Sequence, residues 1–149
     1  MMAGLKALTI AILLAGSTGA SLAACPQELA VYTEAYDGRS ALEFVADTRK
    51  PDIHQHFRLL LRGAKPYSGT VELQESGTRS LGRIDGMWSG AIYAVQSDGS
   101  VTPLKKRGSK AAQSIILSDL SYTLNRHKFA DGTPVLPVFD LYHLTGCQE

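Results

Sequence analysis

The sequence predicts a mainly β domain, a small antiparallel β-sandwich or barrel with one short helix near residues 118–128. Three observations lead to this fold class. Apolar residues recur at every second position in several short runs, turn dipeptides separate these runs at intervals near ten residues, and one later segment changes to helical spacing. Short antiparallel strands spaced in this way are typical of sandwiches and barrels.

The first 24 residues are typical of a secretory signal peptide. Lys6 supplies a positive charge, residues 7–15 (ALTIAILLA) are apolar apart from one Thr, and residues 16–24 are small and weakly polar. The apolar run is too short to cross a bilayer core, which needs about 20 residues. We therefore expect residues 1–24 to be removed on export, and residues 25–149 to form a single domain without a transmembrane helix.

Two cleavage sites are open, and they differ in what happens to Cys25. Ser21-Leu22-Ala23 has small residues at the two positions that a general signal peptidase reads, and cleavage there would leave Ala24 as the new N-terminus. Leu22-Ala23-Ala24-Cys25 resembles the lipobox of bacterial lipoproteins, which would anchor the chain to a membrane through a lipid on Cys25. An exported protein with an even number of cysteines usually pairs them, which would join Cys25 to Cys147. That bridge would close a loop of about 123 residues, worth on the order of 5 kcal/mol in the chain-entropy model. We expect the disulfide, with lipidation as the alternative.

The strand candidates begin soon after Cys25. In the first, the set Leu29, Val31 and Thr33 alternates with the residues between them, and alternation of this kind places one face on a core and the other in water. Similar runs lie at 42–46, 57–62, 71–73 and 92–95. The turn dipeptides between the runs are Asp37-Gly38, Arg62-Gly63, Ser76-Gly77, Asp85-Gly86, Ser89-Gly90 and Asp98-Gly99.

The pattern changes near the C-terminus. Leu120, Leu124 and His127 have helical spacing behind Ser118, which we expect to cap a short helix. After an Asp131-Gly132 turn, residues 135–144 predict a last strand. Pro137 would confine that strand to a sheet edge or break it in two.

One predicted strand carries the most suggestive cluster of side chains. His54 and His56 share a face and could both bind one metal ion, with His127 or His143 as a further ligand. The same face continues with Arg58 and Arg62, and no acidic residue within the strand balances them. Because guanidinium groups match carboxylate and phosphate geometry, His56, Arg58 and Arg62 are also candidate anion-binding residues.

Charge adds a second anion-binding candidate. Once the leader is removed, 14 cations balance 14 acids, and a near-neutral domain of this kind excludes general nucleic-acid binding. The cations are uneven, because residues 105–128 hold six of them against the single acid Asp119. The candidate anion-binding residues here are Lys105, Lys106, Arg107 and Lys110.

No pattern in the chain predicts catalysis or a cofactor. Ser89 lies between glycines, but Gly86-Met87-Trp88-Ser89-Gly90 does not have the spacing of a nucleophile elbow. The sequence has no phosphate-binding glycine loop and no dinucleotide fingerprint. We expect no catalytic residues, no cofactor and no enzymatic activity, and we expect Trp88 to lie in the core.

Three short segments are similar to small exported proteins of alphaproteobacteria that have no assigned function. The segments are residues 25–32 (CPQELAVY), residues 56–59 (HFRL) and the terminal Gly146-Cys147. The resemblance implies an envelope location and no activity. We therefore expect a periplasmic or secreted binding or accessory module whose partner is an envelope component or a protein. The alternatives are a periplasmic metal-binding protein that uses His54 and His56, and an inhibitor of a wall-degrading enzyme.

Overall fold

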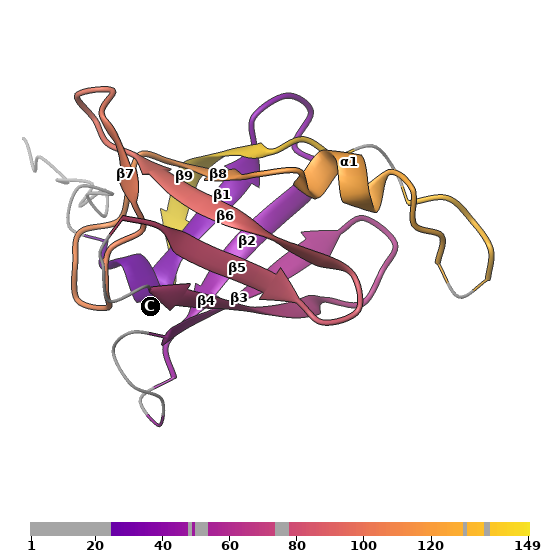
Figure 1. The fold of residues 1–149 in the computed structure, drawn as a ribbon, viewed down its shortest axis with the longest axis horizontal. Helices are drawn as coiled ribbons and strands as arrows, with labels where there is room; N and C mark the ends of the chain where they lie inside the picture. The colour runs from indigo at the N-terminus through magenta and orange to yellow at the C-terminus, as the bar shows by residue number, and fades with distance from the viewer. Residues whose placement is uncertain (1–24, 48, 50–53, 74–77, 130, 136–137) are drawn as a thin grey trace, which may run out of the picture.

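The chain folds into a closed antiparallel β-barrel (Figure 1). The computed structural model describes residues 25–47, 49, 54–73, 78–129, 131–135 and 138–149. Its strands follow the order β5-β4-β3-β2-β1-β9-β8-β6-β7, and pairing of β5 with β6 closes eight of them into a ring. β7 lies outside the ring and extends the sheet beside β6. The mainly β fold class is confirmed, with the barrel as its form.

The strands are short and follow one another closely along the chain. They are β1 (Ala30–Glu34), β2 (Ser40–Val45), β3 (His54–Leu61), β4 (Tyr67–Leu73), β5 (Ser80–Ile84), β6 (Trp88–Val95), β7 (Val101–Pro103), β8 (Ser114–Leu117) and β9 (Leu141–Cys147). A 3-10 turn, η2 (Gln27–Leu29), precedes β1, and one α-helix, α1 (Leu120–Leu124), follows β8. Within the described residues no helix is long and apolar enough to cross a membrane.

Inward-facing side chains fill the barrel, and most of them follow the predicted alternation. Leu42 and Phe44 from β2 and Phe57 and Leu59 from β3 are buried, while their neighbours along each strand lie partly in solvent. β1 differs from its apolar pattern, because Ala30, Tyr32 and Glu34 face inward and Val31 and Thr33 face outward. The large ring of Tyr32 therefore decides the orientation of this strand.

Glycines inside the strands make room for the largest rings. A Cβ on Gly69 would lie 2.2 Å from Cζ of Phe57, and a Cβ on Gly82 would lie 2.7 Å from the Trp88 ring. Trp88 is buried, as expected, and its Nε1 donates to the Ser118 carbonyl oxygen at 2.9 Å. These absent side chains let β4 and β5 pass directly over two aromatic rings of the core.

The turn dipeptides are mostly where the sequence places them. Five of the predicted turn glycines have a positive φ, a backbone conformation that residues with a side chain rarely adopt. They are Gly38, Gly63, Gly86, Gly99 and Gly132. Ser89-Gly90 was a wrong turn assignment, because both residues lie inside β6, where a Cβ on Gly90 would meet the Ser118 carbonyl oxygen at 2.5 Å. Ser76-Gly77 lies outside the described residues.

The predicted short helix is present, but its cap is not Ser118. Leu120 and Leu124 are buried on one side of α1, as their spacing predicts. The residue before the helix is Asp119, whose φ of 59° is left-handed and whose side chain makes no capping bond. Ser118 instead accepts a hydrogen bond from the Ala91 backbone N–H through its Oγ, so it ties α1 to β6.

The last strand was predicted too early in the chain. β9 begins at Leu141 rather than 135 and continues to Cys147. It pairs with β1 on one side and β8 on the other, so it is not an edge strand. Val135 and Val138 are buried but lie outside any strand, and Pro137 lies outside the described residues.

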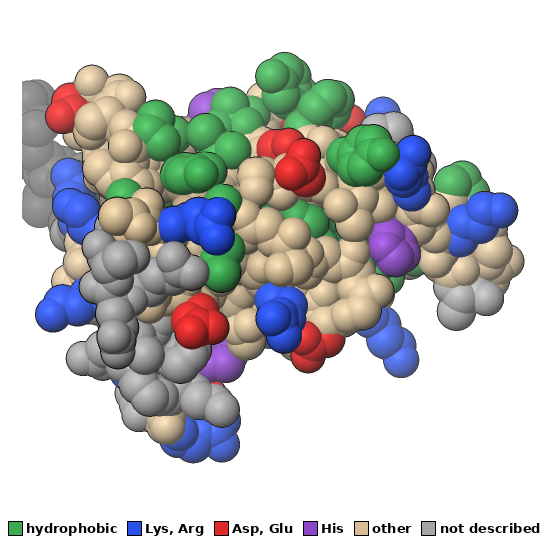
Figure 2. Space-filling view, in the orientation of Figure 1, with side chains coloured by type: hydrophobic (Ala, Val, Ile, Leu, Met, Phe, Trp, Pro, Cys, Tyr) green, Lys and Arg blue, Asp and Glu red, His purple; other side chains and the backbone are tan. Residues whose placement is uncertain are grey.

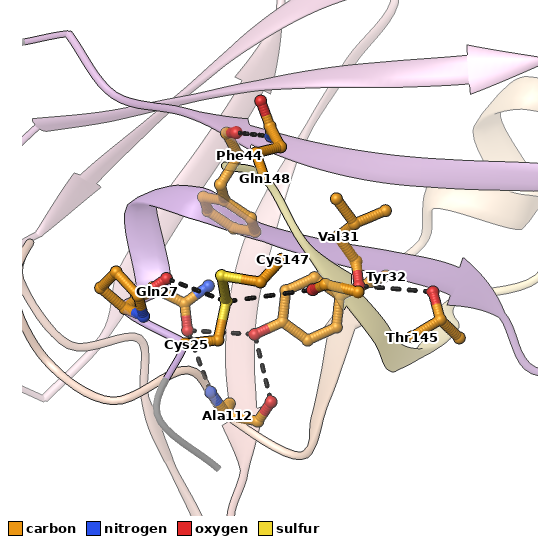
Figure 3. Close-up of a disulfide and its surroundings, with 11 residues drawn as sticks. Cys25, Gln27, Val31, Tyr32, Phe44, Ala112, Thr145, Cys147 and Gln148 are labelled. Atoms are coloured by element: carbon orange, nitrogen blue, oxygen red, sulfur yellow. Dashed lines mark hydrogen bonds between the residues drawn. A yellow bond between two sulfur atoms is a disulfide. The ribbon is translucent and has the colours of Figure 1, made fainter. Parts of the chain in front are cut away.

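A disulfide joins Cys25 to Cys147, as the even cysteine count predicts. The bridge lies beside the junction of the first and last strands, where Ala30 pairs with Cys147 (Figure 3). The Sγ of Cys25 forms the bridge and so is not free for a thioether-linked lipid. The disulfide and the lipid anchor are mutually exclusive, and the structure contains the disulfide.

Candidate functional site

The predicted row of cations on β3 lies on the outside of the barrel, where acids from β2 and the loop after it balance the row. Nη2 of Arg58 lies 2.7 Å from Oε2 of Glu43, its partner in the sheet register. Nε2 of His56 lies 4.0 Å from Oδ2 of Asp47. Hydrogen bonds from Arg49 hold the pKa of the Asp47 carboxyl below its usual range. These pairs leave the β3 row with little net attraction for an external anion.

The sequence also predicts further residues that bind an anion or a metal with His56 and Arg58. Arg62 follows the end of β3 and lies in an exposed turn. His54 belongs to β3, but its side chain is outside the described residues. Nδ1 of His143 lies 2.7 Å from the Ser114 hydroxyl on β8. Among the described side chains no group of three or more His, Cys, Asp or Glu residues could hold a metal ion, so the site at His54 and His56 stays a prediction.

Residues 104–112, which we call the end loop, lie across one end of the barrel. The Gln55 carboxamide, buried inside that end, donates to the Lys105 carbonyl oxygen at 2.5 Å. The Gln27 backbone N–H donates to the Ser109 carbonyl oxygen at 2.8 Å. Leu104, Ala111 and Ala112 are buried, so the loop closes this end with apolar side chains.

Further bonds connect the end loop to the segment beside the disulfide (Figure 3). The Ala111 N–H donates to the Cys25 carbonyl oxygen at 2.8 Å, and the Ala112 N–H donates to Oε1 of Gln27 at 3.1 Å. The Tyr32 hydroxyl lies 3.1 Å from Gln27 Oε1 and from the Ala112 carbonyl oxygen. Burial raises the pKa of Tyr32, so the hydroxyl stays a neutral donor. The loop is therefore held by the barrel core.

The cations of the end loop divide into two kinds. Lys105, Lys106 and Lys110 are exposed, and none of the ion pairs within the described part of the chain involves them. Arg107 is partly buried, and its Nη1 donates to the Asp47 carbonyl oxygen. Arg107 thus joins the loop to the segment after β2, while the three lysines project into solvent.

The sequence predicted these cations but gave no sign of what holds them. The fixed geometry depends on Gln27 and Gln55, to which the sequence patterns assign no role. Their burial follows from the closed barrel, since each lies inside the end that the loop covers. A polar residue at an inward position of an alternating run was the available signal. Gln55 lies two residues before the buried Phe57, and therefore on the same face of the strand.

A second feature, an open groove of about 720 Å³, was missed by the sequence analysis. It lies between the turn after β3 and the segment that follows α1. Arg62 and Lys65 contribute cations, Tyr67 and Phe129 contribute aromatic surface, and Asp131 contributes an acid. Hydrogen bonds from Thr133 hold the pKa of Asp131 below its usual range. The acid balances one of the two cations of the groove, whereas in the end loop Glu28, bonded to the Gly108 N–H, is outnumbered by four cations. The groove therefore selects for charge less strongly than the end loop does.

Comparison with protein-family models, with curated proteins and with solved structures finds no match to this chain.

Proposed function

We propose that this chain is an exported, non-enzymatic accessory module that binds the anionic lipid headgroups of a bacterial envelope. The observation that carries the proposal is the end loop, which presents Lys105, Lys106 and Lys110 as exposed charges that form no ion pair within the described residues. One acid lies on this loop, because Oε2 of Glu28 accepts from the Gly108 N–H at 2.8 Å, and the loop cations outnumber it. Export is supported by the leader-like N-terminus and by the Cys25–Cys147 disulfide, which is typical of an oxidising compartment.

The held loop favours binding to a surface over binding to a small ligand. Its backbone is fixed by bonds to Gln55, Gln27 and Cys25, so little conformational freedom is lost when the lysines meet a charged plane. Each lysine near an anionic membrane contributes about 1 kcal/mol, and the attraction falls off within a Debye length, about 8 Å at physiological salt. Three lysines therefore support weak, reversible and salt-sensitive attachment.

Co-sedimentation with lipid vesicles tests the proposal. We expect the oxidised chain to pellet with phosphatidylglycerol vesicles at low salt, and to remain in the supernatant with phosphatidylcholine vesicles. The triple variant Lys105→Gln/Lys106→Gln/Lys110→Gln should lose this retention. Raising the salt concentration should release the wild-type chain, because the attraction is electrostatic.

A matched control separates this site from net charge. The variant Lys65→Gln/Arg83→Gln/Lys128→Gln also removes three positive charges, but from exposed positions away from the end loop. It should keep its retention on anionic vesicles. Equal loss in both variants, or full retention of the end-loop variant, would refute the proposal. Retention on an acidic polysaccharide but not on the vesicles would likewise exclude lipid as the ligand.

A further inference from the structure

The groove between the turn after β3 and the segment after α1 lies at the opposite end of the barrel from the end loop. Along β3, Gln55 contacts the end loop and Leu61 precedes the groove, so about 20 Å of strand separates the two features. Figure 1 shows the same separation along the barrel. The groove volume of about 720 Å³ lies within the range of about 300–1,000 Å³ that is usual for small-molecule sites. The groove is thus a candidate site that is separate from the lysine surface.

Main-chain hydrogen bonds hold both walls of the groove. On one side the Ala64 N–H donates to the Leu61 carbonyl oxygen at 3.1 Å, which closes the turn after β3. On the other side the Phe129 N–H donates to the Thr133 carbonyl oxygen, and the Gly132 N–H donates back to the Phe129 carbonyl oxygen, both at 2.8 Å. Because both walls are formed in the chain by itself, a ligand would order little additional backbone on binding.

Two aromatic rings supply apolar surface inside the groove. Tyr67, the first residue of β4, and Phe129 are partly buried, and both pack against the barrel core while they also line the groove. The core therefore holds the two rings in place. Pro66 and Pro134 add rigid apolar surface beside them. Aromatic rings that are fixed in this way favour a flat, apolar ligand, which can stack on them.

Two cations lie on the wall formed by the turn after β3. Arg62 and Lys65 are exposed, and the ion pairs found among the described residues include neither of them. Asp37 lies within electrostatic range of Arg62, but it is already paired with Arg39, whose Nε lies 2.8 Å from Oδ2 of Asp37. Figure 2 shows basic and apolar side chains close together at the end of the molecule where Figure 1 places the segment after α1.

The opposite wall contributes one acid, Asp131. Its Oδ1 accepts hydrogen bonds from the Thr133 N–H at 2.9 Å and from the Thr133 hydroxyl at 2.6 Å. One of the two carboxylate oxygens is therefore engaged within its own turn. Two cations against this one acid leave the groove with a single net positive charge, which complements one carboxylate.

We propose that the groove binds a small aromatic carboxylate. Its ring stacks on Tyr67 and Phe129, and its carboxylate pairs with Arg62 and Lys65, where the guanidinium group matches the geometry of a carboxylate. A small anion without a ring gains little in this groove, because a charge pair at an exposed position is weak in water. An aromatic ligand with a positive charge is repelled by the two cations. The groove therefore selects for a molecule that combines a ring with a negative charge.

Nuclear magnetic resonance titration of the oxidised chain with matched probes tests the site. The probes are naphthylacetate, naphthylethanol, naphthylethylamine and acetate, which differ in charge or in the presence of the ring. We expect naphthylacetate to bind about tenfold more tightly than each of the others, because only this probe meets both the rings and the cations. The amide resonances of Ala64 and Gly132 should shift on binding. Equal affinity for naphthylethylamine or for acetate would overturn the proposal, as would the absence of shifts with every probe.

Charge variants test the two walls separately. Arg62→Gln/Lys65→Gln should weaken naphthylacetate binding about tenfold, since the carboxylate loses both of its partners. Arg79→Gln/Arg83→Gln removes two positive charges from exposed positions at β5 and is the matched control, which should bind as the wild-type chain does. Asp131→Asn should tighten binding, because it removes a like charge. Equal weakening in the control, or weaker binding by Asp131→Asn, would contradict the proposed arrangement.

A ring variant tests the apolar part of the site. Tyr67→Leu keeps an apolar side chain against the core but removes the ring, so it should weaken naphthylacetate binding while far-ultraviolet circular dichroism stays unchanged. Unaltered affinity in this variant would overturn the proposal, as would resonance shifts confined to the end loop. If Tyr67→Leu does not fold, the exposed pair Arg62→Gln/Lys65→Gln decides the question. Vesicle retention is measured separately, because its failure would concern the lysines and not the groove.

Discussion

Two tyrosines show how single residues combine bulk and polarity inside this small barrel. Tyr32 and Tyr142 are fully buried, and each hydroxyl has a partner on another element. The hydroxyl of Tyr142 lies 2.9 Å from that of Ser40 on β2, while Tyr32 reaches Gln27. A buried hydroxyl without a hydrogen-bond partner would cost about 1–3 kcal/mol of stability. These hydrogen bonds therefore allow tyrosine rings to occupy the barrel core.

Alkaline pH should destabilise the fold through these same residues. Burial raises the pKa of Tyr32 and of Tyr142 above the ordinary value near 10. Above that pH the unfolded chain loses phenolic protons that the folded chain keeps, so the free energy of unfolding falls as pH rises. For each tyrosine the slope should be about 0.7 kcal/mol per pH unit at pH 10, where half of the unfolded-state phenol is ionised, and approach about 1.4 kcal/mol per pH unit above pH 11. Urea titrations between pH 9 and about 11 measure it.

The variants Tyr32→Phe and Tyr142→Phe provide the check on this slope. Each should lower the free energy of unfolding at neutral pH, because a hydrogen-bond partner is lost. Each should also make the fall in stability at alkaline pH less steep, because one tyrosine no longer contributes a proton to the difference between the folded and unfolded states. Tyr122, on the exposed side of α1, serves as the control, since Tyr122→Phe should leave the slope unchanged. An unchanged slope in both core variants would contradict the role of burial.

Gly69 should tolerate no side chain while Phe57 stands over it. Gly69→Ala would place a methyl group 2.2 Å from the ring carbon Cζ, so either the ring or β4 must move. We expect a loss of about 1–3 kcal/mol, which is typical of overpacking. In the Phe57→Leu background the same substitution should cost less, and a double-mutant cycle by urea denaturation measures the difference. Equal costs in both backgrounds would show that the ring is not the obstacle.

At the scale of elements, the sequence predicted strands well where one face is apolar and the other polar. β2 and β3 have that form, and the buried residues Leu42, Phe44, Phe57, Leu59 and Leu61 are those expected. Ala46 was wrongly placed in the first of these runs, because it is exposed and follows the end of β2, and the buried Gln55 was not expected. β1 does not, because apolar residues occur on both of its faces, and the alternation cannot show that the Tyr32 face is inside. β8 (SIIL) has no alternation and was missed, since Ile115 and Leu117 are buried while the apolar Ile116 lies on the other face of the strand.

The candidate site was predictable in part for a similar reason. The exposed lysines of the end loop are evident as a run of charge in the sequence. The neutralisation of Arg58 is not, because its partner Glu43 is 15 residues away and meets it only through the register of β2 with β3. Which residues pair across two strands depends on the register, and the register depends on the length and geometry of the connecting turn. The register is therefore difficult to predict from a single sequence.

The short helix α1 should contribute to stability through its buried side only. Leu124 is fully buried, so Leu124→Ala should cost about 2–5 kcal/mol in the free energy of unfolding. Tyr122 is 61% exposed and stacks under the Arg126 guanidinium at 4.3 Å, so Tyr122→Ala should cost no more than about 1 kcal/mol. Thermal or urea denaturation compares the two variants. Similar losses would indicate that α1 is not docked on the barrel as described.

At the scale of the whole molecule, the closure of the barrel depends on strands from opposite ends of the chain. β1 and β9 pair along five register positions, with one irregularity between Val31 and Tyr32. We call this pairing of β1 with β9 the seam. Cys25 and Cys147, whose Cα atoms lie 5.7 Å apart, join the two strands at one end of the seam. Cys25 is also the residue whose carbonyl oxygen accepts from the Ala111 N–H of the end loop. One covalent bond therefore fixes both the closure of the barrel and the base of the lysine-bearing loop.

Removal of the disulfide should accordingly weaken the fold and the end loop together. We expect Cys25→Ser/Cys147→Ser to lose about 2–5 kcal/mol in the free energy of unfolding, because the unfolded chain regains the freedom of a loop spanning nearly the whole domain. Urea denaturation of the oxidised, reduced and doubly substituted chains measures the loss, and intact mass distinguishes the oxidised from the reduced form. Since Cys25 lies beside the end loop, hydrogen exchange at Ala111 and Ala112 should accelerate more than exchange at Val71 on β4, on the opposite side of the ring from the junction of β1 and β9. Uniform acceleration would mean that the bridge stabilises the domain only globally, and equal stability of all three forms would mean that the seam holds without it.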